Sequence, residues 1–276
     1  MNYFDAHTHT NFVAYDADRD DVFARTREAG VGMNIVGTQL DTSKTAVALA
    51  EKEGGDVYAT IGLHPIHTSR SYHDAAELGD GGKEFTSRGE VFDVAAYQAL
   101  GKSPRVIAIG EVGLDYFRCD DSTKKIQQDA FIQQVELANT LGKPLMLHVR
   151  ATSGTMNAYE DVLDLIKAHA KVAGDVHFFA GDWSVARRFL DLGFTLSFTG
   201  VLTFTHDYDE VVRNTPLDML LSETDAPYVT PMPHRGTRNE PAYVIEVVRA
   251  IARIKGVGED EAARQLVENV RRVFGI

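Results

Sequence analysis

Residues 106–110, VIAIG, and residues 144–148, PLMLH, decide the fold together with the stretch Thr123–Leu141 between them. The two short apolar runs have the length of buried strands, and the longer stretch between them is amphipathic and has the length of a helix. Strand, helix and strand in this order are typical of a parallel βαβ unit.

The same alternation runs through the whole chain. The strand candidates are YFDAH (3–7), GMNIVG (32–37), VYATIG (57–62), VIAIG (106–110), PLMLH (144–148), DVHFFA (175–180), FTLSF (194–198) and DMLLS (218–222). The helix candidates are residues 20–29, 43–53, 123–141, 156–171 and 184–192, followed at the end of the chain by 241–254 and 259–274. Eight strand-helix units close a barrel. We therefore predict that residues 1–276 form a single (β/α)₈ TIM-barrel domain with an extra C-terminal helix.

One connection departs from this rhythm. Residues 67–103 are unusually long for the segment that joins a strand to the next unit, and they contain the Gly-rich polar run GDGGKEFTSRGE. We expect a long loop insertion after the third strand.

The composition is that of an ordinary globular protein with a formal net charge of −12 and one cysteine, Cys119. One cysteine allows no intrachain disulfide, and no segment approaches the roughly 20 apolar residues that span a bilayer. We expect a soluble, cytoplasmic protein with no membrane contact and no obligate protein partner. The acidic balance argues against broad, non-specific binding to nucleic acid, because phosphate affinity comes mainly from lysine and arginine.

Potential metal ligands lie at the ends of several predicted strands, which in a TIM barrel is the mouth that carries the active site. They are His7, His9, Glu111, His148, His177 and Asp225. The i, i+2 spacing of the first two histidines points both imidazoles to the same side. A histidine near a strand end is more often structural than a ligand, but six such residues at strand ends favour a metal site. His169, on a predicted helix, is interpreted as a surface residue.

Imidazole and carboxylate are the ligands that borderline divalent ions favour. A central Glu111 is placed to bridge two ions roughly 3.5–4 Å apart, a separation that suits displacement at phosphorus. We therefore predict two divalent metal ions, with Zn²⁺, Mg²⁺ and Mn²⁺ left open.

Six stretches resemble the TatD-like metal-dependent deoxyribonucleases, which have an amidohydrolase-type TIM barrel. In chain order they are FDAHTH, GLHP, GEVGLDYF, LHVR, VHFFAG and ETDAPYVTPMPHRGTRNEP. The resemblance covers nearly the whole chain. It implies a metal-dependent deoxyribonuclease that hydrolyses phosphodiester bonds as a 3′→5′ exonuclease, with single-stranded DNA as the substrate.

The resemblance also assigns roles to residues. It implies that His7, His9, Glu111 and Asp225 bind one metal ion, and that Glu111, His148 and His177 bind the other. His64, from the GLHP motif, is similar to a residue that contacts the substrate phosphate.

These residues lead to a mechanistic hypothesis. A metal-bound hydroxide attacks phosphorus, Asp225 accepts or relays its proton, and His64 with an arginine stabilises the phosphoryl oxygens. Arg118, Arg150, Arg235 and Arg238 lie in segments that follow predicted strands. We expect Arg235 to contact the substrate phosphate and Arg238 to be structural.

Two alternatives remain open. The first is another hydrolase on the same scaffold, an esterase, lactonase or phosphotriesterase, because fold alone does not choose a substrate. The second is a non-catalytic metal-binding scaffold protein that keeps the barrel without turnover.

Overall fold

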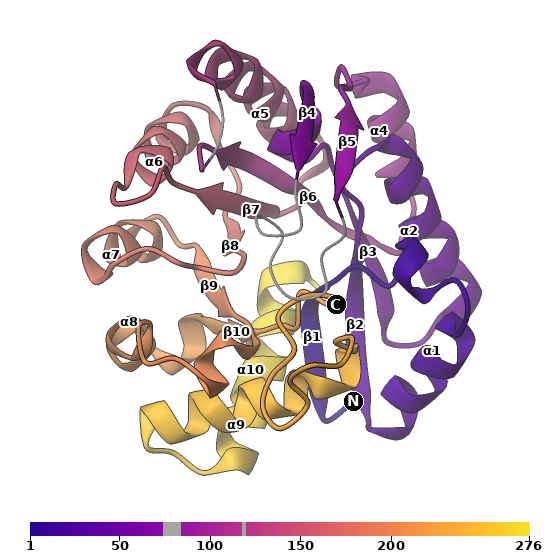
Figure 1. Cartoon of the computed structure of the whole chain (residues 1–276), viewed down its shortest axis with the longest axis vertical. Helices are drawn as coiled ribbons and strands as arrows, with labels where there is room; N and C mark the ends of the chain where they lie inside the picture. Colours follow the sequence, from indigo (N-terminus) through magenta and orange to yellow (C-terminus); the bar gives the residue numbers. More distant parts are fainter. Residues whose placement is uncertain (74–83, 118–119) are drawn as a thin grey trace.

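A ring of parallel strands organises the molecule, which we describe from a computed structural model covering residues 1–73, 84–117 and 120–276. Eight strands lie in the order β1, β2, β3, β6, β7, β8, β9 and β10 (Figure 1). Their bounds are β1 Tyr3–Thr8, β2 Val31–Val36, β3 Val57–Ile61, β6 Val106–Asp115, β7 Leu145–Arg150, β8 Gly174–Val176, β9 Thr195–Phe198 and β10 Leu220–Ser222. This arrangement confirms the predicted TIM barrel.

Helices alternate with the strands and surround the ring (Figure 1). The helix bounds are α1 Arg19–Glu28, α2 Leu40–Glu53, α4 Val94–Leu100, α5 Asp121–Leu141, α6 Asn157–His169, α7 Trp183–Asp191, α8 Asp209–Asn214, α9 Val244–Lys255 and α10 Glu259–Phe274. The short 3₁₀ turns are η1 Val13–Tyr15, η2 Pro65–His67, η3 Gly200–Thr203, η4 Leu217–Met219 and η5 Pro241–Tyr243. Helix α9 completes the eighth unit, so α10 is the predicted extra C-terminal helix.

The barrel closes where the first and last strands meet. A parallel bridge joins Thr8 to Ala226, just beyond β10. The backbone N–H of Asp225 donates to the carbonyl of His7 at 2.9 Å, and that of His9 donates to the carbonyl of Ala226 at 2.7 Å. This seam therefore holds the chain segments that carry three of the predicted ligands.

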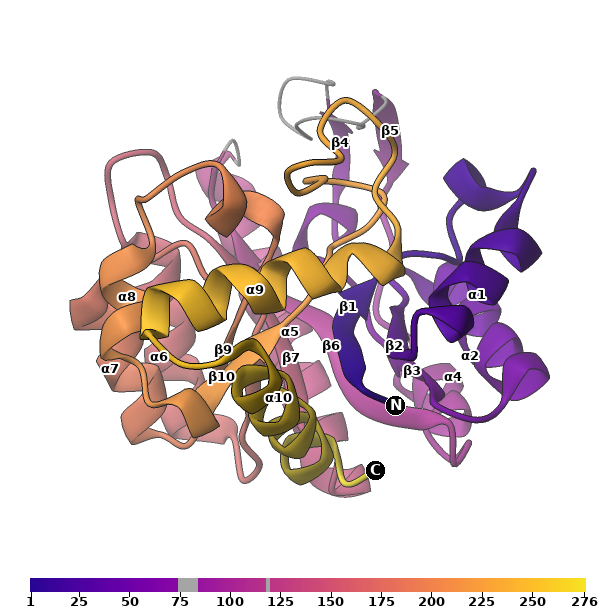
Figure 2. The same ribbon diagram turned by 90° about the horizontal axis from the view of Figure 1, so that it is seen from below.

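Helix α10 covers the end of the barrel opposite the strands β4, Arg70–His73, and β5, Phe85–Arg88 (Figure 2). Its Val267, Val270 and Phe274 belong to a buried apolar cluster with Phe4 and Ile107 from the strands. The end at which the strands begin is therefore packed with hydrophobic side chains, and only the other end offers room for chemistry.

Residues 67–103 differ from the loop that we expected. The described part contains strands β4, Arg70–His73, and β5, Phe85–Arg88, which pair antiparallel, and the helix α4. Asp93 caps that helix by accepting a hydrogen bond from the N–H of Ala96 at 3.0 Å. Residues 74–83 lie outside the described ranges, as do Arg118 and Cys119.

Two strand boundaries also differ from the sequence prediction. Strand β6 does not end at Gly110 but continues to Asp115, so Glu111 lies within the strand. Strand β8 ends at Val176. Phe178 has φ 44°, a left-handed conformation that takes the chain out of the sheet, so His177 follows the strand instead of lying inside it.

In the parts of the chain that the structure describes, none of the helices has the length and apolar character that a bilayer crossing requires.

Candidate metal centre at the barrel mouth

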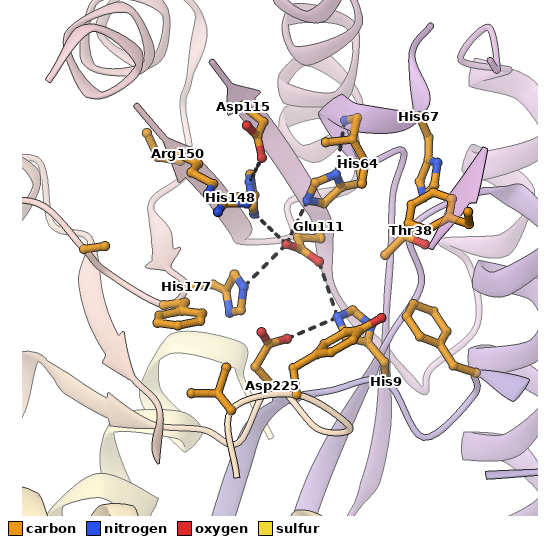
Figure 3. A pocket seen from close by; sticks show the side chains of 18 of the residues that line it. His9, Thr38, His64, His67, Glu111, Asp115, His148, Arg150, His177 and Asp225 are labelled. Carbon is orange, nitrogen blue, oxygen red and sulfur yellow. Dashed lines mark hydrogen bonds and ion pairs between the residues drawn. The ribbon is translucent and has the colours of Figure 1, made fainter. Parts of the chain in front are cut away.

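The six predicted ligands meet inside the mouth, around the carboxylate of Glu111, and Figure 3 labels all of them except His7. They are His7 on β1, His9 just after it, Glu111 on β6, His148 on β7, His177 just after β8 and Asp225 just after β10. All but Glu111 lie near or just beyond the C-terminal end of their strands, as the barrel rule predicts, whereas Glu111 lies in the middle of β6.

The two oxygens of Glu111 serve different groups of histidines. Oε2 lies 3.4 Å from Nε2 of His7 and 3.6 Å from Nε2 of His9. Oε1 lies 2.9 Å from Nδ1 of His148 and 3.4 Å from Nε2 of His177. The carboxylate thus stands between two sets of imidazoles.

Asp225 completes the first of these sets. Its Oδ1 lies 3.4 Å from Nε2 of His9 and 3.8 Å from Nε2 of His7. Its backbone has φ 54°, which is uncommon for a residue other than glycine, and the hydrogen bond to the carbonyl of His7 holds it there. The seam between β1 and β10 therefore positions this carboxylate.

His64 lies closer to the centre than its predicted role as a phosphate contact suggests. Its Nδ1 accepts a hydrogen bond from the N–H of Ile66 at 3.2 Å, so the ring proton is on Nε2. That Nε2 lies 3.2 Å from Oε1 of Glu111. Burial and the neighbouring His148 lower the pKa of His64 to about 4. His64 is therefore a neutral donor that faces Glu111.

Two carboxylates that sequence reasoning missed orient the histidines. Oδ2 of Asp115 lies 2.9 Å from Nε2 of His148, and Oε1 of Glu223 lies 2.8 Å from Nδ1 of His177. Each carboxylate favours a proton on the ring nitrogen that it faces, which would leave the other ring nitrogen of that histidine to bind a cation at the centre. The sequence contains a pattern that could have identified Asp115: Glu111, Gly113 and Asp115 are spaced two residues apart, as residues on one face of a strand are.

Backbone and sulfur atoms orient the other two histidines. Nδ1 of His9 lies 3.0 Å from the carbonyl oxygen of Val36, and Nδ1 of His7 lies 3.1 Å from the sulfur of Met146. In both histidines Nε2 is left facing Glu111. On the side away from the centre, each of the four strand-end imidazoles therefore has an oxygen or sulfur atom within 3.1 Å of its outer ring nitrogen.

Glycine is required where β6 passes β7. Gly113 has φ 144°, and a Cβ atom there would lie 2.0 Å from the carbonyl oxygen of His148. Only glycine allows the two strands to approach this closely, which places the carboxylates of β6 within reach of the imidazole on β7.

The charges of the centre depend on one another. Burial raises the pKa of Glu111, but the surrounding imidazoles of His64, His177 and His7 and the hydrogen bond from His148 outweigh it, so the pKa lies well below its usual value. Burial likewise raises the pKa of Asp225, and the hydrogen bond from His9 with the nearby imidazoles lowers it overall. Both carboxylates are therefore anionic near neutral pH.

The donor set fits divalent cations. Among the described residues, three groups have ligand atoms that all lie within 4.8 Å of one another: His7 with His9 and Glu111, His64 with Glu111 and His148, and His7 with His177 and Glu223. Without a cation, protonated imidazole supplies the positive charge: burial lowers the pKa of His177, but Glu223 and Glu111 raise it to about 10. A bound cation would replace that proton as the partner of the buried carboxylates.

Of the arginines in the described ranges, Arg150 is the one that lines the cavity of about 480 Å³ above the centre. Arg235 lies outside this lining: its guanidinium stacks on Phe204 at 4.2 Å and donates to the carbonyl of Thr230. Arg238 forms a two-pronged ion pair with Asp18 at 2.8 and 2.7 Å, which is the structural role that we expected. The structure thus does not bring Arg235 to the predicted ligands.

Comparisons with known proteins agree with this geometry. A family model described as TatD related DNase matches residues 4–275. The chain is 37% identical over 278 residues to the Bacillus subtilis protein named uncharacterized metal-dependent hydrolase YabD, covering 99% of each chain. It is 36% identical to the Mycobacterium tuberculosis protein named uncharacterized metal-dependent hydrolase TatD, covering 99% of this chain and 97% of the relative. The crystal structure of the TatD homolog YJJV from Escherichia coli superposes with a TM-score of 0.82 at 27% identity, covering 100% and 98% of the two chains.

Proposed function

This chain belongs to the TatD family of metal-dependent hydrolases, and we propose that it is a deoxyribonuclease that removes nucleotides from the 3′ end of single-stranded DNA. One observation carries the proposal: the two oxygens of Glu111 face two separate sets of imidazoles at the floor of a cavity. Such an arrangement suits a pair of cations, and cation pairs serve in-line displacement at phosphorus.

The residues that would hold the ions follow from the distances above. His7, His9 and Asp225 stand on the Oε2 side of Glu111, and His148 and His177 stand on the Oε1 side. Divalent ions bound there would polarise the phosphoryl group and lower the pKa of a water molecule from about 15.7 to around 7.

The side chains of the protein divide the remaining tasks. Asp225 is anionic and only partly covered, so it is able to accept a proton from the attacking water. His64 keeps a neutral N–H that is able to turn from Glu111 to a phosphoryl oxygen. Asp115 and Glu223 hold the tautomers of His148 and His177, so that these imidazoles present lone pairs inward.

The test is nucleotide release from end-labelled single-stranded and duplex DNA. Metal-stripped protein is refilled in turn with Mg²⁺, Mn²⁺ and Zn²⁺, and Glu111→Ala serves as the control, with circular dichroism to verify its fold. Metal-dependent release that the variant lacks, with the label placed at either end to report polarity, would support the proposal. Equal release by wild type and variant with every metal would contradict it.

The lining of the cavity favours one alternative substrate class. Phe178, Ala180 and Val229 give part of the wall an apolar surface that suits a neutral ester, lactone or phosphotriester. A panel of such compounds, run with the same refilled protein, would show turnover without DNA cleavage if this alternative held. A metal-binding scaffold would take up metal and turn over neither class.

A further inference from the structure

The cavity above the metal centre has a chemically mixed lining that the hydrolytic centre alone does not explain. Besides the rings of Phe12 and Phe85, the described lining includes one guanidinium, that of Arg150, and the apolar ring of Phe178, which follows the predicted ligand His177 in the chain. A nucleotide has the matching combination of an anionic phosphate and a flat apolar face. The two residues are therefore candidates for a subsite beside the reacting bond.

Arg150 is held in a fixed orientation at the cavity. It lies two residues after His148 on β7, so both side chains belong to the same face of the strand (Figure 3). Its guanidinium stacks on the ring of Phe117, 3.9 Å from the ring centroid. The guanidinium of arginine carries a planar fork of N–H donors, a geometry that is able to bind a phosphate through two hydrogen bonds.

Phe178 reaches the cavity because of an unusual backbone conformation. Its φ of 44° is rare for a residue with a side chain, and its backbone N–H donates to Oε1 of Glu223 at 2.8 Å. The next residue, Phe179, is fully buried in the core against Tyr159, with ring centroids 5.5 Å apart. Phe178 instead lines the cavity, partly exposed, with its ring centroid 6.0 Å from that of His177.

We propose that Phe178 and Arg150 form a subsite for one unpaired nucleotide, with the base stacked on Phe178 and a phosphate bound by Arg150. The cavity volume of about 480 Å³ lies in the range of small-molecule pockets. A base within a duplex is stacked on its neighbours, so it has to leave the helix to lie on Phe178. The subsite therefore selects strands with an unpaired end, an inference that rests on the proposed nuclease function.

Calorimetric titration of the metal-loaded protein tests the subsite without turnover. The probes are deoxyadenosine monophosphate and deoxyribose 5-phosphate, which carry the same phosphate and differ in the base. Stacking on an aromatic side chain predicts that wild type binds the nucleotide about 5- to 100-fold more tightly than the sugar phosphate. Equal affinity for the two probes in wild type would overturn the proposal.

Variants separate the two contacts. Phe178→Ala is expected to abolish the preference for the nucleotide. Phe178→Leu keeps an apolar side chain without a flat ring, so it is expected to abolish the preference too, and it serves as the test if the alanine variant is unstable. Arg150→Gln is expected to weaken both probes equally, by about 10-fold or more. The matched control is Tyr72→Ala, an aromatic residue on β4 outside the cavity lining, which should keep the preference. A preference that survives both Phe178 substitutions would refute the subsite.

The outcome of this binding experiment is independent of the outcome of the nuclease test. A nucleotide preference that is lost in the Phe178 variants, combined with no DNA cleavage by any metal form, would support the subsite and reject the nuclease. DNA cleavage by wild type, combined with equal binding of the two probes, would support the nuclease and reject the subsite.

Discussion

The two ends of the barrel are built from the same strands but have opposite chemistry. On β1, Phe4 lies in the apolar cluster that α10 covers, and His7 lies at the mouth. On β6, Ile107 belongs to the same cluster, and Glu111 lies at the mouth. At the covered end, burying the apolar side chains lowers the free energy of the folded state. At the mouth, burying the polar side chains raises that free energy unless each of them has a partner.

This difference teaches where stability and function reside. The apolar end fixes the strands relative to one another, and its packing tolerates no polar group without a partner. That rigid frame holds the carboxylates and imidazoles of the mouth in contact. Each of these groups offsets the free-energy cost of burying its neighbour. Substitutions at the two ends should therefore have separable effects, which the following predictions test in order of decreasing size.

Asp225→Asn should have the largest effect, on activity rather than on folding stability. The substitution keeps the shape of the side chain but removes the anionic proton acceptor, which should lower kcat by about 10²–10⁴-fold. DNA hydrolysis by refilled protein, together with the melting temperature, measures this. The control is Asp164→Asn on the exposed face of α6, which should behave as wild type. Unchanged turnover in the Asp225 variant would contradict its role.

Leu221→Ala should show the opposite behaviour at the covered end. Leu221 is fully buried in the cluster beneath α10, and truncating a buried leucine costs about 2–5 kcal/mol of unfolding free energy. Urea denaturation followed by circular dichroism measures the loss, and activity is measured well below the unfolding midpoint. A stable variant with lost activity would show that the two ends are not separable.

Glu223→Gln should weaken metal binding without unfolding the protein. The amide can still accept from the N–H of Phe178 but no longer supplies the negative charge beside His177. Loss of such an orienting group typically lowers metal affinity about 10- to 100-fold. Competition with a metal-sensitive dye measures the affinity, and Glu210→Gln on the exposed side of α8 is the matched control. Equal affinity in both variants would rule out this role for Glu223.

His169→Ala should have the smallest effect. His169 is the last residue of α6, away from the mouth, and its carbonyl rather than its ring accepts a hydrogen bond from Asn139. We expect a change of less than about 0.5 kcal/mol in unfolding free energy and no change in bound metal. Metal analysis of the purified variant compares His169 with the strand-end histidines. Loss of bound metal in this variant would contradict the prediction.

The strand-helix rhythm and the strand-end ligands were visible in the sequence because they follow local patterns. Each strand of the ring overlaps an apolar run that periodicity alone identifies, and the six predicted ligands lie near the ends of those strands. Glu111 was the partial exception. Its strand continues to Asp115 through glycines and a carboxylate, residues that weaken a strand signal, because pairing with β7 stabilises the extension.

Other features depend on contacts between distant residues and were not predictable. The pairing of β4 with β5 joins segments that flank residues outside the described ranges, and neither strand alternates clearly. Glu223 contacts His177 across 46 positions of sequence. Arg235 carried the right chemistry for phosphate, but its stacking on Phe204 places it outside the cavity lining, which only the folded loops reveal.

The seam that closes the barrel also determines when, during synthesis of the chain, the complete set of ligands can assemble. Thr8 and Ala226, which form its bridge, are separated by 218 residues. A chain emerging from the ribosome therefore carries His7 and His9 long before it gains Asp225. Chains that are cut short before Asp225 lack the complete centre.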